Sequence, residues 1–164
     1  DAMQKFINHV DHVAWLVRPE NLDSHIEQLE KITGATLKRF SRQDMGFTMC
    51  ISWEAGLEVV CPMEERTEFN AWLWAELEAK GEGVTSVVFG VKDLDWHKQR
   101  LEKMGIPVGP LMDDHPDSPW HDQLVLWERV VGQQVMNTNI VLGDIDYADG
   151  VIPFGDSGRA FTNA

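Results

Sequence analysis

The stretch GVTSVVFGVKDLD, residues 83–95, decides the fold, because the chain contains a near copy of it earlier. The first copy, VDHVAWLVRPENLD, occupies residues 10–23. Both copies read as an apolar strand, a turn and an Asp at the start of a helix. The match continues in DSHIEQLEKITG after the first turn and in DWHKQRLEKMG after the second. The sequence is therefore an internal repeat of one structural unit.

Each repeat predicts a strand, a helix and three further strands. In the first, we expect strands over 9–17, 35–40, 47–53 and 57–61 and a helix over 22–32. Leu22, Ile26 and Leu29 give this helix one apolar stripe, and Gly34 ends it. In the second, we expect strands over 84–91, 106–111, 124–131 and 133–142 and a helix over 94–104. The sequence predicts an α+β fold of two βαβββ modules.

The expected organisation has five segments: an N-terminal extension over 1–7, a first module over 8–63, a linking helix over 64–82, a second module over 83–142 and a C-terminal tail over 143–164. The tail is rich in Gly and Asp and is expected to pack loosely. The segment MDDHPDSPWHD, residues 112–122, holds several Asp and His side chains that could reach a cleft. Its two prolines favour a plain solvated loop instead.

Composition excludes several classes of partner. The chain has 27 acidic and 14 basic side chains, a net charge of -13, which repels nucleic acid and anionic membrane surfaces. No apolar run approaches the ~18 residues of a membrane span, and no signal-peptide pattern is present. Cys50 and Cys61 lie in apolar, strand-like segments. This usage favours buried thiols in a reducing cytoplasm, with a disulfide between them as the alternative.

Paired modules opened by DHVAWLV (11–17) and GVTSVVFGV (83–91) resemble the vicinal oxygen chelate superfamily. Its members include glyoxalase I, methylmalonyl-CoA epimerase, extradiol dioxygenases and bleomycin-resistance proteins. The resemblance covers residues 8–142, and GEGVTSVVFGVKDLD (81–95) is similar to part of the iron-free amino-terminal domain of 4-hydroxyphenylpyruvate dioxygenase. It implies that the two modules form one open, cleft-shaped mixed β-barrel, and that the protein is a homodimer.

The resemblance also implies a four-cornered metal site, with one side chain from the first and last strand of each module. The first module offers His12 and Glu58. The second offers Ser86 and, by aligning AGLEVVC (55–61) with VGQQVMN (131–137), Gln134. Imidazole and carboxylate are good ligands, whereas an amide is weaker and a neutral hydroxyl poor. The expected cofactor is none, or a divalent metal bound weakly by His12, Glu58 and Gln134.

Without a metal, His12 and Glu58 are the candidate catalytic residues, as an acid–base pair. Strand alternation places apolar side chains on the same face as these two. The cleft should therefore suit a small, partly hydrophobic or aromatic metabolite. The expected ligand-binding residues are Ala14, Leu16, Val60, Ser86, Val88, Gln134 and Met136.

Three functions remain open as hypotheses. The first is a glyoxalase-like protein with a degenerate metal site that binds a small metabolite. The second is an isomerase, epimerase or lyase that acts on a carbonyl compound through His12 and Glu58, with or without a weakly bound metal. The third is a non-catalytic partner domain of a larger assembly, as in the iron-free dioxygenase domain.

Overall fold

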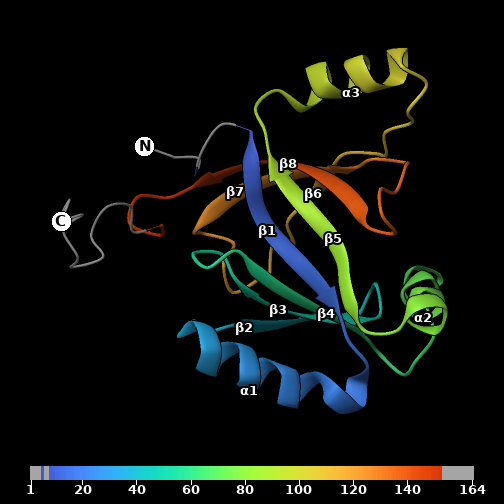
Figure 1. Cartoon of the computed structure of the whole chain (residues 1–164). Helices are drawn as coiled ribbons and strands as arrows, with labels where there is room; N and C mark the ends of the chain where they lie inside the picture. Colours follow the sequence, from blue (N-terminus) through green and yellow to red (C-terminus); the bar gives the residue numbers. More distant parts are fainter. Residues whose placement is uncertain (1–4, 6–7, 153–164) are drawn as a thin grey trace, which may run out of the picture.

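The computed structural model describes Lys5 and residues 8–152, and these residues form a single curved sheet with helices outside it (Figure 1). The first module contains β1 (His9–Leu16), a short 3-10 turn (Pro19–Asn21), α1 (Leu22–Thr33), β2 (Lys38–Arg42), β3 (Phe47–Ser52) and β4 (Leu57–Pro62). The linking helix is α2 (Glu68–Lys80). The second module contains β5 (Gly83–Gly90), α3 (Leu94–Lys103), β6 (Met112–Asp113), β7 (Leu124–Val130) and β8 (Asn139–Tyr147). Each module has the predicted βαβββ order.

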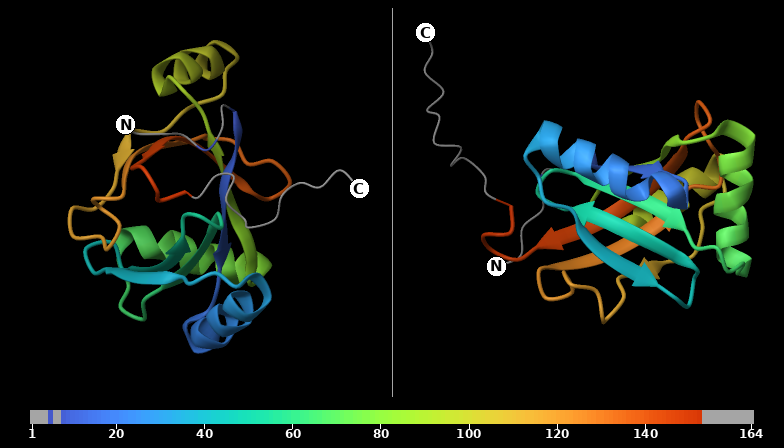
Figure 2. Two further views of the ribbon diagram at one scale, coloured as in Figure 1. Left: turned by 90° about the vertical axis from the view of Figure 1, so that its left-hand side faces the viewer. Right: turned by 90° about the horizontal axis from the view of Figure 1, so that it is seen from below.

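The sheet has eight strands in the order β2-β3-β4-β1-β5-β8-β7-β6. Within each module the first and last strands pair in parallel, β1 with β4 and β5 with β8. The two modules join where β1 runs antiparallel to β5. The sheet curls about this seam, so that β2–β4 and β6–β8 face each other across a half-barrel (Figure 2). The expected α+β, cleft-shaped fold is confirmed.

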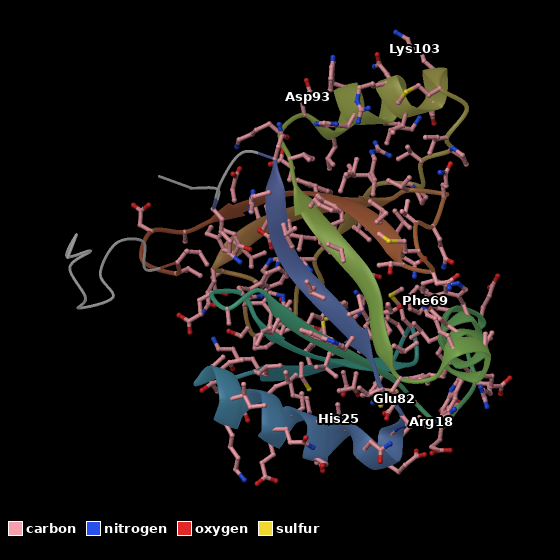
Figure 3. All side chains as sticks on the ribbon, in the orientation of Figure 1. Arg18, His25, Phe69, Glu82, Asp93 and Lys103 are labelled. Atoms are coloured by element: carbon pink, nitrogen blue, oxygen red, sulfur yellow. The ribbon has the colours of Figure 1, made fainter. Side chains whose placement is uncertain are left out.

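Helix α1 covers the outer face of the first module. Leu22 and Ile26 of α1 pack against Cys50, Val59 and Cys61 on the outer face of the first module. Both cysteines are buried free thiols. At the seam, Glu82 accepts a hydrogen bond from the backbone N–H of Arg18 at 2.8 Å and lies 3.2 Å from His25 Nε2 of α1 (Figure 3). These contacts fasten α1 to the start of β5.

The linking helix α2 closes one end of the half-barrel. Leu73 and Leu77 pack in a cluster with Ala14, Leu16 and Phe47. No helix in the described part of the chain is both long and apolar enough to span a membrane.

The second module departs from prediction at its C-terminal end. β8 was expected over 133–142, but it begins at Asn139 and continues to Tyr147. Met136 and Asn137 take positive φ values of 52° and 57° in a tight turn closed by a bridge between Val135 and Thr138, so no strand can form there. The segment expected as a loose tail therefore starts inside a strand, and Tyr147 is fully buried. Residues 153–164 of that tail lie outside the described residues. The strand expected over 106–111 is also wrong, because β6 contains only Met112–Asp113.

Candidate functional site

A cavity of about 420 Å³ lies inside the half-barrel, between the facing halves of the sheet. We call it the central cavity. Its polar side chains come from both modules and include His12 from β1, Glu58 from β4, Ser86 from β5 and Glu128 from β7. Most of the remaining wall is apolar or aromatic, including Ala14, Phe40, Met45, Phe47, Met49, Ile51, Trp53, Val60, Phe69, Trp72, Val88, Trp120, Leu126, Val130 and Val141.

His12 is held between two carboxylates. Its side chain is 2% exposed, its Nδ1 lies 2.8 Å from Asp11 Oδ1, and its Nε2 lies 3.3 Å from Glu58 Oε2. Burial alone lowers the pKa of an imidazole, but the hydrogen bonds to Asp11 and Glu58 outweigh it and raise the pKa of His12 to about 10. His12 is therefore an imidazolium at neutral pH, with one N–H directed at the cavity carboxylate.

Asp11 and His12 can meet because β1 is irregular between them. Adjacent side chains of a regular strand point to opposite faces. The pairing of β1 with β5 skips from Val10 to His12, however, which marks a β-bulge at Asp11. A bulge re-aims a side chain, and here it brings the Asp11 carboxylate to His12 Nδ1.

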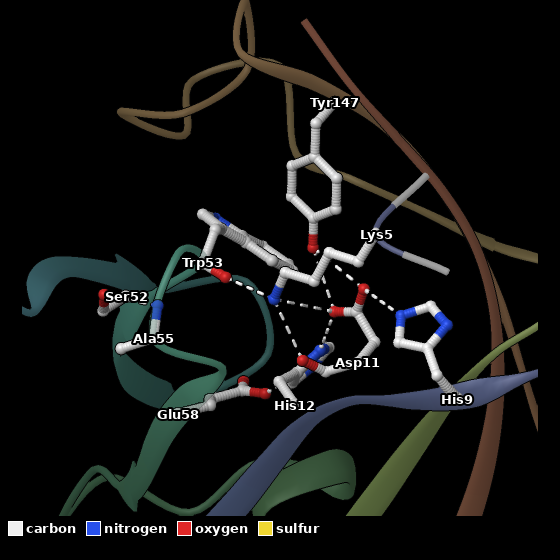
Figure 4. A network of polar contacts seen from close by, with 9 residues as sticks. All are labelled: Lys5, His9, Asp11, His12, Ser52, Trp53, Ala55, Glu58 and Tyr147. Atoms are coloured by element: carbon white, nitrogen blue, oxygen red, sulfur yellow. Dashed lines mark hydrogen bonds and ion pairs between the residues drawn. The ribbon is translucent and has the colours of Figure 1, made fainter. Parts of the chain in front are cut away.

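Asp11 itself is enclosed by a second group of polar side chains (Figure 4). Tyr147 donates its hydroxyl at 3.0 Å to both carboxylate oxygens, while Lys5 Nζ lies 4.0 Å and His9 Nε2 3.6 Å from them. Burial raises the pKa of the Asp11 carboxyl, but the hydrogen bonds and charges of His12 and Lys5, with the Tyr147 hydrogen bond, lower it below its usual range. Asp11 is thus an ionised partner that fixes the orientation and charge of His12.

Glu128 is a further ionisable group of the cavity, and it was not predicted. It is partly exposed, and it lines the central cavity. Burial among apolar neighbours raises the pKa of its carboxyl to about 7, although the positive charge of His12 acts in the opposite direction. Strand alternation could have found it, since Leu124, Leu126, Glu128 and Val130 share the inward face of β7. A single carboxylate on an otherwise apolar strand face indicates a candidate functional residue.

Six of the predicted site residues line the central cavity: His12, Ala14, Glu58, Val60, Ser86 and Val88. Leu16 does not, because it is buried beyond the cavity under α2. Gln134 and Met136 also lie elsewhere, in the turn before β8. Met136 is 90% exposed, and Gln134 donates to the Asn139 side chain at 2.9 Å.

The alignment that placed Gln134 opposite Glu58 is wrong. In the first module Ala14 pairs with Glu58, and in the second module the equivalent Val88 pairs with Val141. The fourth corner of the site is therefore an apolar valine. The error arose because the Gly and Gln residues of the turn imitate the start of β4.

The loop over 112–122 is not the plain solvated loop that its prolines favoured. Asp113, Asp114, His115 and Trp120 line the central cavity. Asp114 accepts hydrogen bonds from Ser118 Oγ at 2.7 Å and Trp120 Nε1 at 3.1 Å, and Trp120 is 1% exposed. The loop thus carries an aromatic wall of the cavity.

The four corner residues do not fit a tightly bound divalent metal. They are His12, Glu58, Ser86 and Val141, of which only the first two carry good donor atoms. Both ring nitrogens of His12 already face carboxylates, at 2.8 and 3.3 Å. The described residues contain no group of three His, Cys, Asp or Glu side chains placed to hold a metal ion. Weak metal binding by His12 and Glu58 stays a prediction.

The aromatic side chains form a continuous wall next to His12. Trp53 stands edge-on to His12, with the ring centres 5.2 Å apart, and it contacts Trp120 at 5.9 Å. Trp120 in turn contacts Phe40 at 6.0 Å. A planar or apolar ligand would therefore be enclosed by rings, in a cavity that the His12 cation and the Glu128 carboxyl also line.

No protein-family model and no curated protein sequence matches the chain. Solved structures do match. The methylmalonyl-CoA epimerase of Mycobacterium tuberculosis has a TM-score of 0.61 and 17% identity, over 87% of this chain and 91% of that one. The Streptomyces coelicolor epimerase in complex with 2-nitronate-propionyl-CoA has a TM-score of 0.60 and 16% identity, over 85% and 98%. A mutant of 4-hydroxymandelate synthase from the same organism has a TM-score of 0.66 and 14% identity, over 88% of this chain and 50% of that one. The chain thus shares a glyoxalase-like fold with these structures.

Proposed function

We propose that the protein binds a small, mainly apolar carbonyl compound in the central cavity and moves a proton on the carbon next to the carbonyl. The observation that carries this proposal is that the His12 imidazolium and the Glu128 carboxyl line the same, mainly apolar cavity. Two titratable groups whose pKa values are displaced by their surroundings are typical of acid–base sites. The epimerases among the similar structures support this reaction class, which is an isomerase or epimerase.

Each group has a defined task in this mechanism. Glu128 has a pKa of about 7, so a substantial fraction is ionised at neutral pH and can accept the proton from carbon. The negative charge that then develops on the carbonyl oxygen is stabilised by the N–H of His12, which remains protonated because Asp11 and Glu58 hold its pKa near 10. Return of the proton from Glu128 to the same face of the carbon gives hydrogen exchange with retention, and protonation of the planar enolate on its opposite face completes an epimerisation.

Glu58 differs from its predicted role in this mechanism. It was expected to exchange protons with His12, whereas a group that keeps His12 protonated acts as its counter-charge. We propose that a carbonyl oxygen takes the place of Glu58 as the acceptor of the Nε2 hydrogen bond when a ligand binds.

Hydrogen exchange tests the proposal without knowledge of the natural substrate. A panel of neutral ketones in D₂O is followed by NMR for exchange of the protons next to the carbonyl. We expect the protein to accelerate exchange for at least one apolar ketone and Glu128→Gln to lower that rate at least a hundredfold. Glu78→Gln, on an exposed face of α2, is the control and should keep the rate. Equal rates in the Glu128→Gln protein and the parent would refute the role of Glu128.

A second candidate is a binding protein that holds the same ligand class without turnover. The aromatic wall of Phe40, Trp53 and Trp120 favours it, because such a wall binds ligands whatever chemistry follows. Ligand binding by calorimetry with no exchange in D₂O would favour this candidate over the isomerase.

The predicted homodimer is a separate proposal, measured by sedimentation.

A further inference from the structure

The central cavity continues into a surface groove beside α2. Met45, Phe69 and Trp72 line both spaces, and the groove adds Asp44, Thr67 and Glu68. Phe69 lies at the start of α2, at the side of the half-barrel (Figure 3). Its ring centre is 5.3 Å from that of Phe47 in the cavity and 6.2 Å from that of Trp72. An aromatic surface therefore runs without a break from the cavity to the outside.

The two walls of this groove are fixed to each other. Thr67 caps α2 and donates its hydroxyl to the carbonyl of Met45 at 2.7 Å. Asn70 is fully buried and donates its amide to the carbonyls of Gly46 and Glu65 at 2.8 and 2.7 Å. The turn between β2 and β3 is thus tied to the first turn of α2. Phe69 is 37% exposed and Trp72 46% exposed beside these fixed walls.

The charges around the groove select against anions. Arg42 lines the cavity mouth, but it donates two hydrogen bonds to Asp44, at 3.0 and 2.8 Å. This pairing lowers the pKa of the Asp44 carboxyl to about 2, so the two charges offset each other. Glu68 adds a further negative charge, and the six residues that line the groove include no Lys or Arg. The groove is apolar at its floor and acidic at its rim.

We infer that this groove is a second subsite, which takes an uncharged, apolar extension of the ligand whose carbonyl group lies at His12 and Glu128. This inference rests on the proposed function for the position of the carbonyl group. It names the ligand class as elongated, neutral ketones with an alkyl or aryl tail. It separates this chain from enzymes that act on thioesters of the highly anionic coenzyme A, whose phosphates would meet the acidic rim.

A homologous series of ketones measures the subsite directly. Dissociation constants of 2-butanone through 2-nonanone are determined by calorimetry, so that a change in tryptophan content does not affect the readout. Because burying a methylene is worth about 0.8 kcal/mol, affinity should rise about fourfold for each methylene that enters the groove. Trp72→Ala should flatten this dependence on chain length. Trp96→Ala, which removes a 56% exposed tryptophan from α3, should preserve it.

Charge at the end of the tail is the second readout. 8-Oxononanoate has the chain length of 2-nonanone and ends in a carboxylate, and it should bind at least tenfold more weakly. Equal affinity for the two compounds, or a chain-length dependence that survives Trp72→Ala, would overturn the inference. The two proposals fail separately. Chain-length dependence without deuterium exchange would refute the proposed catalysis and support the subsite. Deuterium exchange without chain-length dependence would refute the subsite and support the catalysis.

Discussion

Replacing Glu128 by Gln should change how the stability of the protein depends on pH. The pKa of the Glu128 carboxyl rises from 4.5 in the unfolded chain to about 7 in the folded protein. The folded state therefore binds more protons than the unfolded state between these values, so this group stabilises the fold below pH 4.5 and loses that contribution as pH rises through 7. At about 1.4 kcal/mol per pH unit, the loss between pH 5 and pH 8 is about 2 to 3 kcal/mol.

The Gln variant has no such titration. Its free energy of unfolding relative to the parent should rise by about 2 to 3 kcal/mol between pH 5 and pH 8. Urea unfolding followed by circular dichroism at each pH measures this difference. His12 contributes to both proteins and cancels to first order, because its pKa of about 10 keeps it charged in the folded state throughout this range. Glu78→Gln on the exposed face of α2 is the control and should follow the parent. Parallel profiles for the parent and the Glu128→Gln protein would refute the argument that the cavity raises the pKa of the Glu128 carboxyl.

Three further predictions concern the surroundings of the cavity. Tyr147→Phe removes the hydroxyl that bonds both oxygens of Asp11 and should cost about 1 to 3 kcal/mol in urea unfolding, and an unchanged midpoint would show that water replaces the hydroxyl. Gly56→Ala should destabilise the protein more than Gly34→Ala in thermal unfolding. Both glycines have positive φ, so both substitutions strain the backbone. A Cβ at residue 56 would in addition lie 2.8 Å from the Asp11 carbonyl oxygen, whereas a Cβ at residue 34 meets nothing within 4 Å. Equal losses of stability in the two variants would mean that backbone strain, and not the contact with Asp11, determines the effect. A chelator should leave ketone exchange unchanged, since the four corner residues offer only two good ligands, and loss of exchange that returns with added Zn²⁺ or Mg²⁺ would contradict this.

Most of the fold could be predicted from the repeat, because apolar periodicity and turn residues determine secondary structure locally. The repeat of an apolar strand, a turn and a helix start, with NLD in the first copy and DLD in the second, places both modules. Strand register is different, because it depends on which backbone groups pair across the sheet. The turn over 132–138 contains apolar and polar residues in an order that imitates a strand, and only the positive φ of Met136 and Asn137 shows otherwise. Gln134 was misplaced for this reason.

Half of the candidate site was visible in the sequence and half was not. His12 and Glu58 could be found because the family resemblance implies a metal ligand on the first and last strands of each module. Asp11 could not be recognised as the partner of His12, because alternation assigns adjacent residues to opposite faces and the bulge that reverses this is a tertiary feature. Tyr147 was hidden by the low periodicity of its surroundings. Glu128 was within reach of an alternation argument along β7.

The hydrogen bond between Tyr147 and Asp11 also bears on how the protein is made. It joins residues that are 136 positions apart, on the first and last strands along the chain. During synthesis β1 leaves the ribosome long before β8. Asp11 can therefore form its hydrogen bond to Tyr147 only after the residues up to β8 have been translated. Contacts of such sequence separation form slowly because a long loop must close first. A chain that stalls before residue 147 therefore holds Asp11 beside His12 without the hydroxyl that bonds both of its carboxylate oxygens.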